Sequence, residues 1–135
     1  MTLTEDNVAD YADTLVRQMR AQEVPLDYSP ESVAALERLI AESDSQTRTP
    51  DFPEAQRNLL VFYNGCYLGE VMARNLGGVW RFDPQNWADS TLVFPYGEGG
   101  LQVFPFLKLW LRLTEGPDEN NLVAYYRGLE EKLAS

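Results

Sequence analysis

Glu70 is the residue best placed for acid–base chemistry, because it interrupts a long run of apolar side chains. The stretch from Asn58 to Trp80, NLLVFYNGCYLGEVMARNLGGVW, is apolar on nearly every side of a helix and predicts a buried one. A carboxylate in such surroundings can exchange a proton as a general acid or base. Arg74 follows four residues later, at the spacing of an ion pair within one helix. We therefore predict a structural ion pair for Glu70, to which Arg81 or Arg112 could also contribute after folding, with catalysis as the alternative.

Aromatic residues near this carboxylate could form a ligand cleft with it. Tyr63 and Tyr67 share one face of the expected helix, and Trp80 lies in the segment that follows. If a sheet packs on that face, phenol and indole groups would line a cleft beside Glu70. We name Tyr63, Tyr67, Glu70 and Trp80 as candidate ligand-binding residues and no residue as catalytic. Ordinary core packing is the commoner reason for aromatic residues at helical spacing, and it is the competing interpretation.

The composition removes several kinds of catalytic and metal site. The chain has no histidine, which excludes Ser-His-Asp and Cys-His catalysis and the commonest metal ligand. Cys66 is the single cysteine, so neither an intrachain disulfide nor a thiolate zinc site can form. The acidic residues near expected loops do not have the spacing of a calcium-binding loop. We expect no metal and no cofactor.

The charge of the chain restricts its partners. Twenty-one acidic residues against eleven basic ones give a net charge of −10. Nucleic acids and anionic membranes attract Lys and Arg, so we expect neither as a partner. A protein with a basic surface is compatible with this charge, because complementary potentials speed and select encounters, and a homodimer stays open. The first ten residues, MTLTEDNVAD, do not resemble a secretory signal, so we expect a cytoplasmic protein.

Three helices are expected in the first half of the chain. Thr2 and Glu5 have the spacing of a capping box, which predicts a helix that starts there and ends before Pro25. Ser29-Pro30 is a strong start signal for a second helix, which fades near Ser43. The polar segment 43–49 is expected to be a loop.

The third helix should run from about Asp51 to Leu76, since Gly77-Gly78 supplies a stop. Within it, Gly65, Gly69 and Ala73 recur every four residues, which predicts that another backbone packs close to that stripe.

The second half of the chain changes to short β-branched and aromatic segments. The expected elements are strands at 79–82, 91–94 and 101–104, a hairpin turn at 97–100, and helices at 105–115 and 122–133. Consecutive strands with short links favour an antiparallel sheet. We predict an α+β fold in which helices pack on one small antiparallel sheet, in the order ααα-βββ-αα, with residues 1–135 forming a single domain.

Two segments resemble a family of small bacterial proteins of unknown function. LDYSPESVAALERLI, residues 26–40, resembles their second-helix segment, and FYNGCYLGEVMARNLGGVW, residues 62–80, resembles their central motif of Leu-Gly-Glu followed by Gly-Gly-x-Trp. Together the two segments cover about a quarter of the chain. The resemblance implies a compact α+β fold, marks Glu70 and Trp80 as characteristic positions, and supplies no catalytic residue.

The acidic composition and the missing catalytic and metal motifs favour a non-enzymatic protein-binding domain. One version is a protein like the immunity proteins that neutralise toxins, and another is an acidic secretion chaperone that holds an unfolded client. The alternative is a small enzyme or ligand-binding protein that uses Glu70 with Tyr63 or Tyr67 in an aromatic cleft.

Overall fold

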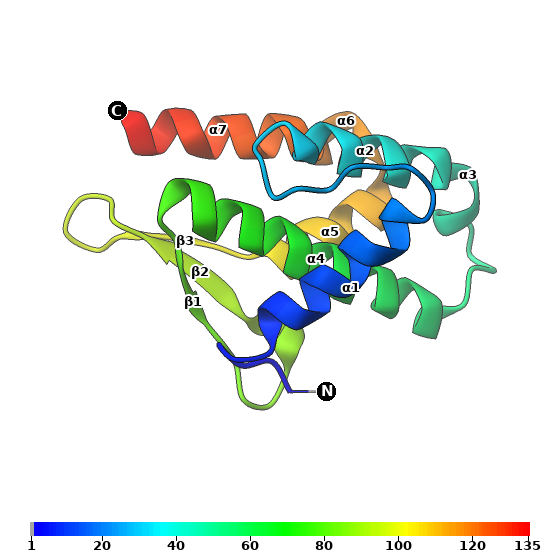
Figure 1. Cartoon of the computed structure of the whole chain (residues 1–135), viewed down its shortest axis with the longest axis horizontal. Helices are drawn as coiled ribbons and strands as arrows, with labels where there is room; N and C mark the ends of the chain where they lie inside the picture. The colour runs from blue at the N-terminus through cyan, green and yellow to red at the C-terminus, as the bar shows by residue number, and fades with distance from the viewer. Residues whose placement is uncertain (1) are drawn as a thin grey trace.

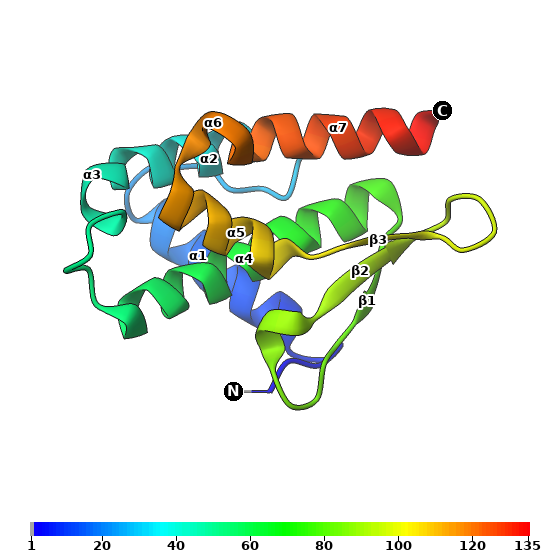
Figure 2. The ribbon, with the colours of Figure 1, turned by 180° about the vertical axis from the view of Figure 1, so that it is seen from behind.

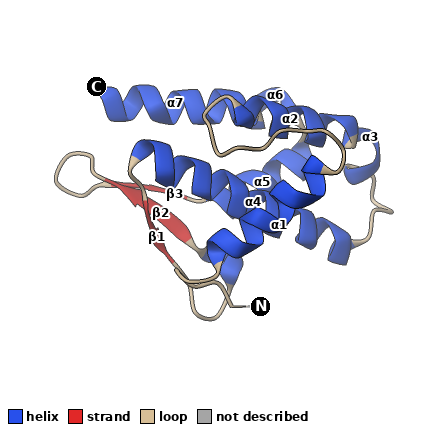
Figure 3. Ribbon diagram, in the orientation of Figure 1, coloured by secondary structure: helices blue, strands red, loops and turns tan. Residues whose placement is uncertain are grey.

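The computed structural model describes residues 2–135 and shows helices packed with one small sheet (Figures 1 and 3). The helices are α1 (Val8–Arg20), α2 (Ser32–Glu42), α3 (Asp44–Thr47), α4 (Glu54–Leu76), α5 (Pro105–Glu115), α6 (Pro117–Asn120) and α7 (Leu122–Ala134). The strands are β1 (Val79–Arg81), β2 (Thr91–Phe94) and β3 (Leu101–Val103), and a short 3-10 helix, Trp87–Asp89, precedes β2. The predicted α+β class is confirmed.

Helix α4 lies at the centre of the molecule. In Figure 1 α1 crosses in front of α4, and in Figure 2, seen from behind, α5 does. The buried side chains of α4 are Val61, Phe62, Asn64, Cys66, Tyr67, Leu68, Glu70, Val71 and Met72. The helix ends at Gly77, whose φ of 80° is a left-handed conformation that glycine adopts without strain. The expectation of a long buried helix with a glycine stop is confirmed.

The three strands form an antiparallel sheet in the order β1-β2-β3. Trp80 pairs with Leu92 and Val93 pairs with Gln102, which fixes the register of both neighbours. Leu92 on the central strand is fully buried, so the sheet packs its inner side against the helices. The polypeptide leaves β3 directly into α5 through Pro105, which takes the first helical position as expected.

The structure corrects four local expectations. Helix α1 begins at Val8 rather than near Thr2, because Asn7 closes a turn before it: the Asn7 carboxamide accepts from Thr4 N at 2.8 Å and donates to Thr2 O at 2.9 Å. Helix α2 begins at Ser32, after a turn that starts at Ser29. Short helix α3 lies in the segment expected to be a loop, and short helix α6 lies between the two last expected helices, where no helix was predicted.

A second group of helices lies on the side of α4 that faces away from the sheet. In Figure 1, α2, α3, α6 and α7 run along the top, with α2 beside α7. Within residues 2–135, no helix combines the length and the apolar character that crossing a bilayer requires.

Candidate functional site

Glu70 is held by two donors, one for each carboxylate oxygen. Arg74 Nη2 donates to Oε1 at 3.0 Å, and Trp80 Nε1 donates to Oε2 at 2.9 Å. Glu70 is only 8% exposed, so these bonds replace most of its contact with water. The predicted ion pair with Arg74 is confirmed, and the indole donor is an addition to it. The geometry favours a structural role for this carboxylate over an open catalytic one.

The Trp80 ring also explains why the residue before Glu70, Gly69, is a glycine. A Cβ atom added to Gly69 would lie 2.2 Å from Trp80 Cζ2, which is far inside van der Waals contact. The same holds one turn earlier, where a Cβ on Gly65 would lie 2.3 Å from Phe106 Cδ1. Aromatic rings, and not a second backbone, therefore pack against Gly65 and Gly69. The expectation of close backbone packing at this stripe was wrong. In this chain the Leu-Gly-Glu and Gly-Gly-x-Trp segments form a packing unit.

Tyr67 is fully buried and anchors the connection between α1 and α2. Its hydroxyl accepts from Tyr28 N at 2.9 Å and shares a hydrogen bond with Ser32 Oγ at 2.7 Å. The Tyr28 ring stacks on it at 4.9 Å, and the Arg74 guanidinium lies 3.8 Å from the centre of the Tyr28 ring. Tyr28 has φ 64°, a strained conformation for a residue other than glycine, which these contacts maintain.

The four candidate residues do not line one cleft. Glu70 and Trp80 are in contact, whereas Tyr67 is completely buried and bonded to the α1–α2 connection. Tyr63 is half-buried, packs edge-on against Tyr11 with ring centres 6.2 Å apart, and lines a separate groove between α1, α2 and α4. Ligand binding by these four residues stays a prediction.

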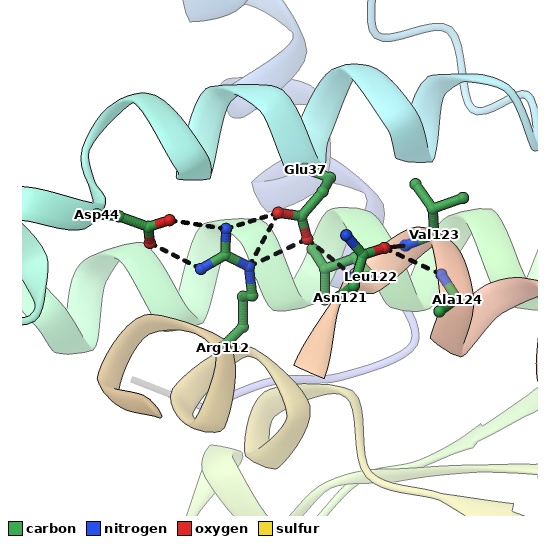
Figure 4. A network of polar contacts seen from close by, with 7 residues as sticks. All are labelled: Glu37, Asp44, Arg112, Asn121, Leu122, Val123 and Ala124. Atoms are coloured by element: carbon green, nitrogen blue, oxygen red, sulfur yellow. Dashed lines mark hydrogen bonds and ion pairs between the residues drawn. The ribbon is translucent and has the colours of Figure 1, made fainter. Parts of the chain in front are cut away.

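Arg112 organises a polar network that sequence reasoning did not find (Figure 4). The side chain is 0% exposed and donates to both oxygens of Glu37, with Nη2 lying 2.6 Å from Oε2. Its Nη1 also donates to Asp44 Oδ1 at 2.7 Å. Glu37 Oε1 accepts in addition from Leu122 N, the first residue of α7, at 2.9 Å. Four helices, α2, α3, α5 and α7, are thus joined through Arg112 and Glu37.

The electrostatics of this network favour its charged form. Burial by itself disfavours the Arg112 cation, but the hydrogen bonds and charges of Glu37 and Asp44 outweigh that effect and raise the pKa of Arg112. Two carboxylates and one guanidinium together carry a net charge of −1. The N-terminal end of α7 has a partial positive charge, which stabilises this negative charge. Each charged group of the network is hydrogen-bonded to another member of it, so we interpret the network as structural. The expectation that Arg112 could reach Glu70 was wrong.

A different region of α5 is open to solvent. Phe104, Leu107 and Trp110 recur every three residues and are 42%, 50% and 46% exposed. Phe106, Leu109, Trp110 and Leu113 are apolar at helical spacing, but Trp110 stays exposed while the other three enter the core. We call Phe104, Leu107 and Trp110 the α5 face.

Hollows flank the α5 face on both sides. One, of about 490 Å³, lies between the α5 face, the 3-10 helix and α4, and Trp87, Phe106 and Asn58 help to line it. The other, of about 270 Å³, lies toward β3 and α7, where Val103, Leu111 and Tyr125 contribute. The α5 face therefore combines protruding apolar side chains with recesses that could receive those of a partner.

Comparisons with protein families, with curated proteins and with solved structures give no match. The resemblance to small bacterial proteins stays a prediction. Within residues 2–135, no three side chains among Cys, Asp and Glu come together as a metal ion would require.

Proposed function

We propose that this chain is a protein-interaction domain that binds its partner through the α5 face. The observation that carries the proposal is the exposure of three large apolar side chains, Phe104 at the N-cap of α5 and Leu107 and Trp110 on the helix itself. A contiguous apolar patch is uncommon on a monomer surface unless something covers it. Tryptophan and other aromatic side chains are also frequent anchors at protein interfaces.

The charges around the α5 face support a basic partner. Asp89 is the charged residue that lines the larger hollow. Asn58 of α4 also lines it, and Glu54 lies one helical turn before Asn58. Lys108, next to the smaller hollow, is engaged inside the molecule: its Nζ donates to Asn120 Oδ1 at 3.1 Å and lies 4.9 Å from the centre of the Tyr125 ring. A partner segment with apolar side chains for the hollows and Lys or Arg around them would complement this surface.

Two known kinds of protein would use such a face. An immunity-type protein would hold one folded toxin, and a secretion chaperone would hold an unfolded client. Both interpretations place the contact on the α5 face, and both fit an acidic chain. A homodimer through the same face is opposed by charge, because each copy carries a net charge of −10.

The test compares two exposed apolar residues that lie far apart in sequence. Leu107 is 50% exposed on the α5 face, and Val79 is 62% exposed on the edge strand β1. We expect Leu107→Glu to lower partner capture from cell extract by about tenfold, whereas Val79→Glu leaves capture within about twofold of wild type. Equal capture by both variants would refute the proposal, and urea denaturation of each variant checks that it is folded.

A further inference from the structure

We propose a second binding site, for a neutral and largely apolar small molecule, in the groove between α1, α2 and α4. The groove has a volume of about 460 Å³, within the range of sites that hold small organic ligands. It is distinct from the α5 face and does not depend on the proposed protein partner.

The walls of the groove are largely apolar and come from separate helices, with Gln18, Gln22 and Ser43 among the polar residues. Leu15 and Met19 of α1, Ile40 of α2, and Leu60 of α4 contribute to them. At its rim, Leu59 is 48% exposed. An apolar ligand that covered this leucine would remove a large hydrophobic side chain from water.

Two buried polar side chains of the groove have hydrogen-bonding capacity to spare. Asn64 is 6% exposed and donates from Nδ2 to Leu60 O at 2.8 Å, but within residues 2–135 no donor reaches its Oδ1. Thr47 is 1% exposed, and its Oγ1 has no hydrogen-bond partner in the described chain. Buried polar groups are nearly always hydrogen-bonded, and leaving one unpaired costs free energy. Asn64 Oδ1 stays accessible to solvent, so a ligand hydroxyl or N–H group in the groove could donate to it, whereas the enclosed Thr47 Oγ1 is out of a ligand's reach.

The charge of the lining selects a neutral ligand. Glu42 is the charged residue of the groove, and no Lys or Arg is among the described residues that line it. A carboxylate, sulfonate or phosphate would enter without a counter-charge and would face both Glu42 and an acidic molecule. The site is thus suited to an uncharged aromatic or aliphatic compound that carries at least one hydrogen-bond donor.

Two fluorescent probes with the same ring system test this selectivity. N-Phenyl-1-naphthylamine is neutral and has one N–H donor, and 8-anilino-1-naphthalenesulfonate adds a single negative charge to the same skeleton. We expect the neutral probe to saturate at one molecule per chain and to bind at least about tenfold more tightly than the sulfonate. Equal or tighter binding of the sulfonate, or no saturable binding of the neutral probe, would overturn the proposal.

Variants at the rim locate the site. Leu59→Glu places a carboxylate at the mouth and should weaken the neutral probe by about tenfold, while Val79→Glu, outside the groove, should change its affinity by less than about twofold. Asn64→Leu should weaken the probe as well, by removing the acceptor. Because Leu59 is exposed, its variant should fold, so unchanged binding by Leu59→Glu overturns the proposal. The groove and the α5 face are tested at different residues and can fail separately.

Discussion

Glu70 shows how the fold uses a carboxylate inside an apolar helix. Its two oxygens accept from Arg74 and from the indole of Trp80. The arginine side chain is 43% exposed, so its ion pair is weakened by solvent, whereas the half-buried indole packs against Gly69. The two bonds together tie the end of α4 to the first strand of the sheet.

Replacing Glu70 with glutamine removes the charge while preserving the size of the side chain. We expect Glu70→Gln to lower the free energy of unfolding by about 1–3 kcal/mol, the scale of a lost charge-assisted hydrogen bond. In a double-mutant cycle with Trp80→Phe, the two losses should not be additive, because the residues share one hydrogen bond. Urea denaturation measures both. A Glu70→Gln variant as stable as wild type would instead indicate a strained carboxylate of the kind found in active sites.

Cys66 should be chemically inert in the folded protein. Burial, with a smaller contribution from the negative charge of Glu70, raises the pKa of its thiol well above the ordinary value. The reactive thiolate is therefore scarce, and the side chain is 0% exposed. Ellman's reagent at about pH 8 should leave the native thiol unmodified and react with one thiol per chain after unfolding in urea. Rapid stoichiometric modification of native protein would contradict this burial.

At the scale of elements, α4 was predictable because it combines length, a start signal and a glycine stop. The hairpin between β2 and β3 and helices α5 and α7 were predictable for similar reasons. Helices α3 and α6 have four residues each, little more than one helical turn, so no periodicity can reveal them.

Only polar contacts between residues close in sequence could be predicted. Glu70 and Arg74 are four residues apart on one helix, whereas Arg112 and Glu37 are 75 residues apart and meet only through the tertiary fold. One signal for Glu37 was available, because it lies one turn after Val33, on the apolar face of α2.

Two glycines in helices provide a matched test of packing. A Cβ on Gly69 would clash with Trp80, while a Cβ on Gly128, in α7, would meet no atom within 4 Å. We expect Gly69→Ala to destabilise the fold by about 1–3 kcal/mol through displacement of the indole. We expect Gly128→Ala to stabilise it by up to about 1 kcal/mol, since alanine favours a helix. Thermal melts with tryptophan fluorescence compare them, and a neutral Gly69→Ala would show that the indole can move freely.

At the scale of the whole molecule, the interior and the surface use charge differently. The chain as a whole has a net charge of −10, and buried charge gathers in the Arg112 network. That network joins α2, α3 and α7 to α5, the helix that presents the α5 face. If the α5 face binds a partner as we propose, a rigid α5 would lower the entropy lost on binding.

Removing Arg112 should be far more damaging than removing an exposed arginine. Arg112→Met leaves Glu37 and Asp44 without their cation, which should cost about 3–5 kcal/mol. Arg74→Met breaks a half-exposed pair and should cost about 1 kcal/mol or less. Urea denaturation at two salt concentrations compares them, and the Arg112 effect should be nearly independent of salt because the side chain is buried. Equal losses for both variants would contradict the structural role of the network.

Site-specific photo-crosslinking tests the use of the α5 face most directly. The photoreactive residue p-benzoylphenylalanine replaces Leu107 on the α5 face or Val79 on the edge of the sheet, and cells that produce each protein are irradiated. We expect a discrete adduct with one protein, rich in Lys and Arg at the contact, from position 107 and none from position 79. An adduct from position 79 alone, or the same adducts from both positions, would contradict it.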